Sequence, residues 1–253
     1  MRRLMPAFTL CSTLLCAAPA HADQIKVLTT GAFKQVVVAL VPQFEAQTGH
    51  KVTVDNDTAG ALVKRIDGGE AFDVIVLTPG ALKQYADKGR VLPASVATLA
   101  KVGIGLAVKA GAPVPEMKTV EQFKKILLDA QKVAYIDPAA GGSSGIYLTG
   151  LFQKMGITDQ IKPKAVLVNG GLVATKLVSN EADVAVHQIS EILPVAGVTL
   201  VGPLPDEIQN FTVYAGGVNA ASAYQGAAQA FVSMMVGAGA AETIRAKGML
   251  PGR

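Results

Sequence analysis

The chain has 253 residues, half of them hydrophobic, and its 23 Lys and Arg against 19 Asp and Glu give a formal net charge of +4. Trp is absent and no basic block is interleaved with aromatic residues, which argues against nucleic-acid binding. This length suffices for one large hydrophobic core or for two lobes.

Residues 1–22 have the features of a secretory signal peptide: two early arginines, an apolar stretch, and Ala-His-Ala at 20–22 as a cleavage site. Cleavage after Ala22 would leave 253 − 22 = 231 residues with a charge of (23 − 2) − 19 = +2, and it predicts a periplasmic location. Cys11 and Cys16 would leave with the signal peptide, so we expect no disulfide and no Cys-based metal site.

Strands and helices alternate at short spacing after the signal peptide. Strands are expected at 25–31, 51–57 and 72–78, and helices at 32–49, 59–69 and 79–89. In the first helix, Val37, Leu40, Val41 and Phe44 recur at helical spacing. Such alternation predicts an α/β fold with a mostly parallel sheet covered by helices on both faces.

The pattern changes at 102–115, where an apolar strand runs into a bend rich in Gly and Pro, and a second alternating set follows. Helices are expected at 119–131, 143–156 and 171–182, and strands at 132–137, 164–168, 183–188 and 198–205. The run 211–220 resembles the strand at 102–109, and two helices close the chain. We therefore predict lobe I from 23–103 plus 214–253 and lobe II from 104–213, joined by two crossing strands that act as a hinge.

Three expected strand-to-helix junctions are rich in small and hydroxyl residues: TTGA at 29–32, TAGA at 58–61 and GGSSG at 141–145. Helix N-termini leave backbone N–H groups unpaired and carry partial positive charge. Small residues let a ligand approach these groups, and the hydroxyls of Thr30, Thr58, Ser143 and Ser144 could donate to its oxygens. Each junction could also be an ordinary helix cap. Three of them, spread over both lobes, favour a shared anion-binding cleft.

GGSSG also fits the G-x-S-x-G pattern of a hydrolase elbow around Ser143. That reading needs an acid and a histidine later in the chain, but Asp183 and His187 fall on one expected strand, roughly 13 Å apart by strand rise. We therefore disfavour a serine hydrolase. His187 ends an apolar strand and could bind an anion or move a proton, or it could be a buried histidine that a backbone group satisfies. No spacing suits a metal site, and we expect neither a metal nor a cofactor.

The order and spacing of KVLTTGAFKQ, LVKRIDGGEAFDVIVLT, IDPAAGGSSGIY and LVSNEADVAV resemble the periplasmic solute-binding proteins of ABC importers, in particular the molybdate-binding branch. The resemblance implies two α/β lobes of the type II binding-protein fold that close on a small anion, with an ABC permease and its ATPase as partners. We expect a monomer. It places oxyanion donors at Ala32, at Ala59 or Thr58, at Ser144, near Gly171 and at His187.

Three of these positions depart from the family pattern, because alanine stands at 32 and 59 where serine is expected and histidine stands at 187 where tyrosine is expected. Lost hydroxyl donors disfavour molybdate, and a larger pocket favours an organic carboxylate. A second resemblance, around VAYIDPAAGGSSGIYL, QISEI and VGPLPDEIQ, is to bacterial aconitate isomerases, which implies a proton shift on a tricarboxylate with His187 as the acid/base group. The predicted ligand-binding residues are Thr30, Gly31, Ala32, Thr58, Ala59, Ser143, Ser144, Gly171 and His187.

Overall fold

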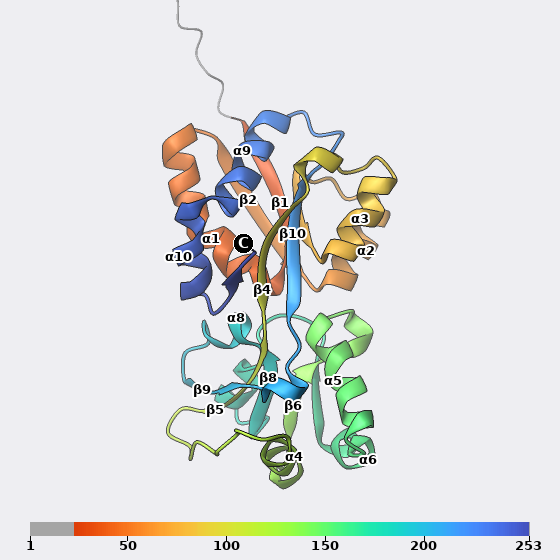
Figure 1. Ribbon diagram of the computed structural model, residues 1–253, viewed down its shortest axis with the longest axis vertical. Coiled ribbons are helices and arrows are strands. Elements are labelled where there is room, and N and C mark those ends of the chain that lie inside the picture. The colour runs from red at the N-terminus through yellow and green to blue at the C-terminus, as the bar shows by residue number, and fades with distance from the viewer. Residues whose placement is uncertain (1–22, 253) are drawn as a thin grey trace, which may run out of the picture.

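The computed structural model describes residues 23–252, so the predicted signal peptide lies outside the described residues. The chain forms two α/β lobes, one above the other in Figure 1. Each lobe is built on its own β-sheet with helices packed against it, one sheet of six strands and the other of five.

The six-stranded sheet of the upper lobe takes strands from both ends of the described chain. Its strand order is β11-β4-β10-β3-β1-β2. The strands are β1 (Gln24–Thr30), β2 (Lys51–Asp57), β3 (Val74–Leu77), β4 (Ala97–Val102), β10 (Thr212–Val218) and β11 (Leu250–Pro251). The helices around it are α1 (Gly31–Thr48), α2 (Ala59–Asp67), α3 (Pro79–Asp87), α9 (Gln225–Val236) and α10 (Ala238–Ala246).

The five-stranded sheet of the lower lobe comes from one continuous stretch of chain, in the order β7-β6-β8-β5-β9. The strands are β5 (Ile104–Lys109), β6 (Val133–Ile136), β7 (Ala165–Val168), β8 (Val184–Gln188) and β9 (Val198–Pro203). The helices of this stretch are α4 (Val120–Asp129), α5 (Ser143–Lys154), α6 (Thr158–Ile161), α7 (Thr175–Val178) and α8 (Ile189–Ile192). Short 3-10 turns occupy Pro93–Ser95, Pro138–Ala140, Lys162–Lys164 and Asp206–Ile208.

Each lobe has its own hydrophobic core because its helices bury one apolar face on the sheet. In α1, the buried face includes Phe33, Val37, Leu40 and Phe44, at the spacing that the sequence predicts. All four residues of β3 are buried because helices cover both faces of the sheet there. A separate cluster that contains Phe123 and Leu148 fills the lower lobe.

The predicted two-lobed α/β class is confirmed, but the sheets are mixed rather than mostly parallel. β1 pairs in parallel with β2 and β3, and β6 pairs in parallel with β7 and β8. β10 runs antiparallel to β3 and β4, and β5 runs antiparallel to β8 and β9. The antiparallel pairs arise because β4 and β5 carry the chain from the upper lobe to the lower one and β10 brings it back (Figure 1).

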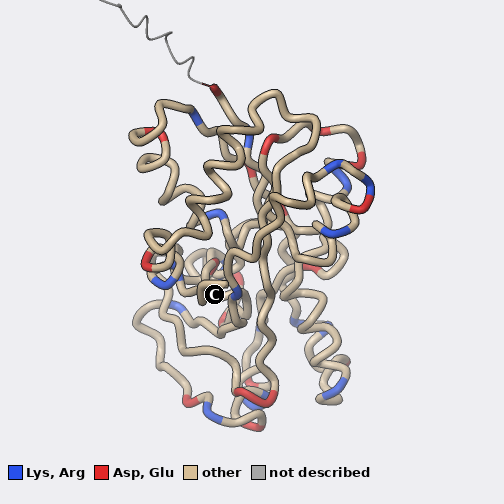
Figure 2. The backbone as a smooth tube through the Cα atoms, turned by 45° about the horizontal axis from the view of Figure 1, so that its top comes forward, with Lys and Arg blue, Asp and Glu red and all other residues tan. Residues whose placement is uncertain are grey.

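Charged residues of both signs are scattered along the outer elements of both lobes (Figure 2), in keeping with the nearly balanced charge of residues 23–253. Among the helices of residues 23–252, none combines the length and the apolar composition that crossing a bilayer requires.

Candidate functional site

A small cavity lies where the two lobes face each other, at the ends of β1, β2 and β8. Its volume is about 30 Å³. The lining comes from both sheets and from the helices that follow their strands, as expected for a ligand site in an α/β protein. The residues that line it are Thr30, Gly31, Ala32, Asn56, Asp57, Thr58, Ala59, Ile136, Gly142, Ser143, Ser144, Gly171, His187, Gln188, Glu191 and Tyr214.

All nine residues that were predicted from the sequence to bind a ligand therefore line one cavity. Their role in binding a ligand stays a prediction, but their convergence has a simple structural cause. Thr30 ends β1 and Ala32 follows it. Ala59 follows β2, Ser144 lies in the first turn of the helix after β6, and His187 is near the end of β8. Strand ends in the two lobes thus bring segments together that are more than 150 residues apart.

At two of the helix N-termini at the cavity, no side chain bonds the first turn. Thr30 and Gly142 are the N-cap residues of α1 and α5, and neither makes a side-chain hydrogen bond to the first turn. The first N–H groups of these helices therefore remain available to an anion in the cavity. The first turns of α1, α2 and α5 contain no acidic residue that would compete with it.

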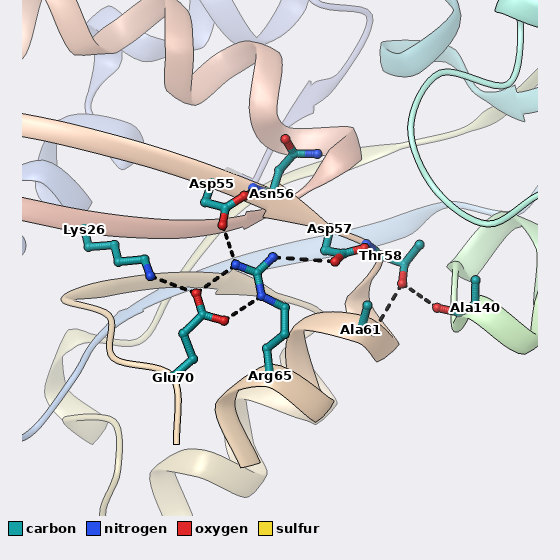
Figure 3. Close-up of polar contacts among 9 residues, drawn as sticks. All are labelled: Lys26, Asp55, Asn56, Asp57, Thr58, Ala61, Arg65, Glu70 and Ala140. Atoms are coloured by element: carbon teal, nitrogen blue, oxygen red, sulfur yellow. Dashed lines mark hydrogen bonds and ion pairs between the residues drawn. The ribbon is translucent and has the colours of Figure 1, made fainter. Parts of the chain in front are cut away.

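Thr58 is one of the predicted ligand-binding residues, but its hydroxyl is hydrogen-bonded within the protein. Its oxygen accepts from the backbone N–H of Ala61 at 3.1 Å and caps α2, while its proton goes to the carbonyl of Ala140 in the other lobe (Figure 3). The N–H of Gly60 donates to the carbonyl of Gly141 at 3.1 Å beside it. These contacts hold the lobes together over the cavity, so in this closed form Thr58 has no hydroxyl proton left for a ligand.

His187 and Glu191 form a buried acid–base pair at the cavity. His187 Nε2 lies 3.5 Å from Glu191 Oε2, and the two side chains are 2 % and 9 % exposed. Burial lowers the pKa of His187 to about 3 and raises the pKa of Glu191 to about 8. Near pH 7 both groups are therefore neutral, with a proton on the carboxyl group and a free lone pair on the imidazole. His50 lies outside the cavity and accepts a hydrogen bond from the N–H of Asp23 at 3.2 Å.

Seven residues that line the cavity were not predicted from the sequence, and several of them have polar side chains. Tyr214 on β10 donates its hydroxyl proton to Gln188 Oε1 at 2.9 Å, across the boundary between the lobes. Gln188 and Glu191 both lie within QISEI, a stretch that carried the second resemblance, so the sequence contained a signal for them. The seven residues are Asn56, Asp57, Ile136, Gly142, Gln188, Glu191 and Tyr214.

No Lys or Arg is among the residues that line the cavity in the described chain. Arg65 is near, but it is committed to structural ion pairs (Figure 3). Its guanidinium binds Asp55 and Glu70, and its Nη1 lies 3.5 Å from the Asp57 carboxylate. These contacts hold the end of β2 against α2 and leave the binding of an anion to neutral donors and helix N-termini. Within residues 23–252, no group of three His, Cys, Asp or Glu side chains is placed to hold a metal ion.

The buried pair predicts an unusual dependence of stability on pH. Between pH 4.5 and 8 only the folded protein binds the Glu191 proton, so stability falls as pH rises. Between pH 3 and 6.5 only the unfolded protein binds the His187 proton, so stability falls as pH drops. We expect a plateau from pH 4.5 to 6.5, and from 6.5 to 8 a loss of about 2 kcal/mol at ~1.4 kcal/mol per pH unit, or about 4–8 °C in Tm.

Thermal unfolding of the ligand-free protein across this pH range measures the effect. Glu191→Gln should remove the alkaline loss, and Glu207→Gln, at an exposed position, should keep it. An alkaline loss that is the same in Glu191→Gln and in the wild type would contradict the assignment.

Residues 25–250 match the family model of the bacterial extracellular solute-binding proteins. A curated relative from Pseudomonas sp., named aconitate isomerase, is 31 % identical over 257 residues, which covers 98 % of this chain and 97 % of that protein.

Solved structures share the fold at lower identity. The periplasmic molybdate-binding protein of Azotobacter vinelandii superimposes with a TM-score of 0.77 at 22 % identity, over 89 % of this chain and 98 % of that one. The sulfate-binding protein of Mycobacterium tuberculosis H37Rv gives 0.73 at 17 % identity, over 91 % and 87 %. The match to the family model extends over nearly all of the described residues. The chain therefore belongs to the bacterial extracellular solute-binding protein family, and its fold is that of the molybdate-binding proteins.

Proposed function

We propose that this protein is an isomerase built on a solute-binding fold, and that it interconverts the cis and trans isomers of aconitate by moving a proton. The observation that carries the proposal is the buried pair of His187 and Glu191 at the cavity between the lobes. The full-length similarity to a protein named aconitate isomerase supports it. A proton shift requires an acid/base group at the ligand, and titratable groups with strongly shifted pKa values are typical of functional sites.

The chemistry requires one acid/base group next to bound carboxylates. Aconitate has a methylene group beside its carbon–carbon double bond. Removal of one methylene proton leaves an electron pair spread over three carbons and the adjacent carboxylate. Return of a proton to the far carbon moves the double bond and forms either geometric isomer. One proton leaves and one returns, so the reaction is balanced with no further reactant.

His187 is suited to be the base, because its neutral imidazole lines the cavity and its Nδ1 has no partner within the described protein. Bound carboxylates would raise the pKa of His187 from its low value, since an opposite charge favours the protonated form. Glu191 is close enough to accept a hydrogen bond from Nε2–H after a small movement, which keeps the free lone pair of the imidazole on Nδ1. The free N–H groups of α1 and α5 would hold the carboxylates.

Proton NMR tests the proposal directly, because the olefinic protons of the two isomers have different shifts. Purified protein incubated with cis-aconitate should produce trans-aconitate, and the reverse reaction should reach the same equilibrium ratio. Boiled protein serves as the control. Binding of aconitate without any turnover would contradict the isomerase and favour the second function below.

The second candidate is capture of an organic anion for an ABC importer, and membership of the solute-binding family favours it. In that case the lobes would close on a carboxylate and present one surface to a permease. Calorimetry with citrate, the aconitates and molybdate separates the ligands. Tight binding of molybdate alone would contradict both the isomerase and the preference for a carboxylate.

Closure of the lobes over the ligand predicts a marked effect of Gly60→Ala. A Cβ at Gly60 would lie 2.8 Å from the Cα of Gly141 in the other lobe, a contact with backbone that cannot turn away. The closed form should lose about 1–2 kcal/mol, which weakens aconitate binding about five- to thirtyfold. The Tm of the ligand-free protein should fall by at most about 2–8 °C, because separation of the lobes limits the loss to the 1–2 kcal/mol of the closed form.

Calorimetry and thermal unfolding measure the two effects. Gly80→Ala is the matched control, since Gly80 is also the second residue of its helix and a Cβ there meets nothing within 4 Å. Equal affinity in the two variants would argue against closure at this contact.

A further inference from the structure

Three buried polar atoms at the cavity have no hydrogen-bond partner within the described protein: Thr30 Oγ1, His187 Nδ1 and Gln188 Nε2. Nearly all buried polar groups in proteins are paired, so unpaired ones at a cavity mark where a ligand completes the bonding. Thr30 and His187 were already nominated from the sequence. Gln188 was not, and it is only 3 % exposed.

The orientation of the Gln188 amide is fixed by a neighbour from the other lobe. The Tyr214 hydroxyl donates to Gln188 Oε1 at 2.9 Å, and both side chains are buried. Because the oxygen end of the amide is occupied, its NH2 end is the one left free. Burial, with the nearby Glu191 as a second cause, raises the pKa of Tyr214, so Tyr214 keeps its proton and remains a donor at any working pH.

We propose that Gln188 is a ligand-binding residue whose amide NH2 donates to a carboxylate oxygen of the bound anion, and that Tyr214 is the positioning residue that holds this amide in place. The inference rests on the proposed function only in placing a carboxylate in this cavity. It assigns the site a donor beyond those of the helix N-termini, from the end of β8.

The electrostatics of the cavity favour a neutral donor at this point. The charged or titratable side chains that line it are Asp57, His187, Glu191 and Tyr214, and Lys and Arg are absent from the lining. A carboxylate that enters must be matched by hydrogen bonds rather than by an ion pair. An amide NH2 supplies such a bond without a change of its own protonation. It also differs from a hydroxyl, because it cannot rotate to become an acceptor once its oxygen is held.

Calorimetry with trans-aconitate, citrate and molybdate tests the assignment, with the tightest wild-type ligand as the probe. Gln188→Glu keeps the acceptor for Tyr214 but replaces the donor by an oxygen, and Gln188→Met keeps the length and removes both polar ends. We expect each to weaken binding at least tenfold, because a bond from a donor to a carboxylate is stronger than a neutral one. The value of kcat should change much less than KM.

Tyr214→Phe tests the positioning role. Alone it should weaken binding about three- to tenfold, and in the Gln188→Met background it should add less than twofold, because its effect acts through Gln188. Tyr147→Phe is the control, since the Tyr147 hydroxyl donates to the carbonyl of Ile208 at 2.7 Å and lies outside the cavity lining. Additive losses from Tyr214→Phe and Gln188→Met would overturn the positioning role.

The outcomes separate this inference from the proposed function. Variants of Gln188 that fold and bind the probe within twofold of the wild type would overturn the inference and leave the isomerase untouched. A wild type that binds trans-aconitate without turnover would overturn the isomerase, and the Gln188 variants would still decide the inference through Kd. A wild type that binds none of the three anions would overturn both.

Discussion

His187→Gln is expected to abolish isomerisation while the protein still folds and binds. Glutamine keeps a polar group of similar reach but cannot take up a carbon-bound proton, so kcat for conversion of cis-aconitate should fall by about 10²–10⁴-fold. Binding of trans-aconitate, measured by calorimetry, should change by less than about tenfold, because the free helix N-termini of α1 and α5 remain. The rate is measured by proton NMR, and far-UV circular dichroism checks the fold.

His50→Gln is the matched control, because it makes the same chemical change outside the cavity, at a residue bonded to the Asp23 N–H. It should keep the wild-type kcat. Glu191→Gln should retain the fold and lose less activity than His187→Gln, because the glutamine oxygen can still accept a hydrogen bond from Nε2–H. A His187→Gln enzyme with more than a tenth of the wild-type kcat would remove His187 from the chemistry.

Gly145→Ala is expected to cause a large loss of stability. Gly145 lies in the first turn of α5, and an added Cβ would come within 2.1 Å of the Ile136 carbonyl oxygen and 2.9 Å of its carbon, at the end of β6. Neither atom can move without a shift of the helix or the strand. We expect a cost of at least about 3 kcal/mol, the upper end for overpacked cores, and a fall in Tm of about 6–12 °C.

The same helix contains its own control, Gly150, where a Cβ meets nothing within 4 Å. Gly150→Ala should stabilise the protein by about 0.5–1 kcal/mol, since alanine favours a helix over glycine. Thermal unfolding of the two variants compares one chemical change at two positions of α5. Similar Tm values would contradict the close packing of α5 on the end of β6. The contact also sets where Ser143 and Ser144 lie, so weaker anion binding should accompany the Gly145 change.

The sequence allowed the strand and helix segments and the three small-residue junctions to be predicted, because both depend on local chemistry. Helical spacing of apolar residues predicted α1, and runs of Gly, Ser and Thr predicted the junctions at Thr30, Thr58 and Ser143. Strand direction was harder to predict. The crossing strand at 211–220 was predicted, but periodicity is the same in parallel and antiparallel strands. The antiparallel pairing of β10 in one sheet and of β5 in the other, which makes the sheets mixed, therefore left no local mark.

The acid–base pair was only half predicted, for a related physical reason. His187 stood out because it ends an apolar strand, but Glu191 lies just after that strand, and acidic residues usually face water. Its burial depends on the other lobe, which packs Gly31 against its carboxyl group. Tyr214 meets Gln188 only because β10 passes between the lobes. Contacts of this kind belong to the closed arrangement of the lobes and to no single segment.

The path of the chain has a consequence for the order in which the molecule assembles. All strands of the five-stranded sheet lie between Ile104 and Pro203, so that sheet can be completed while the polypeptide is still emerging. The six-stranded sheet has to wait, because β10 separates β3 from β4 and is synthesised last but one. Until β10 has been made, the two edges of β3 and β4 that it later joins are both without a partner strand.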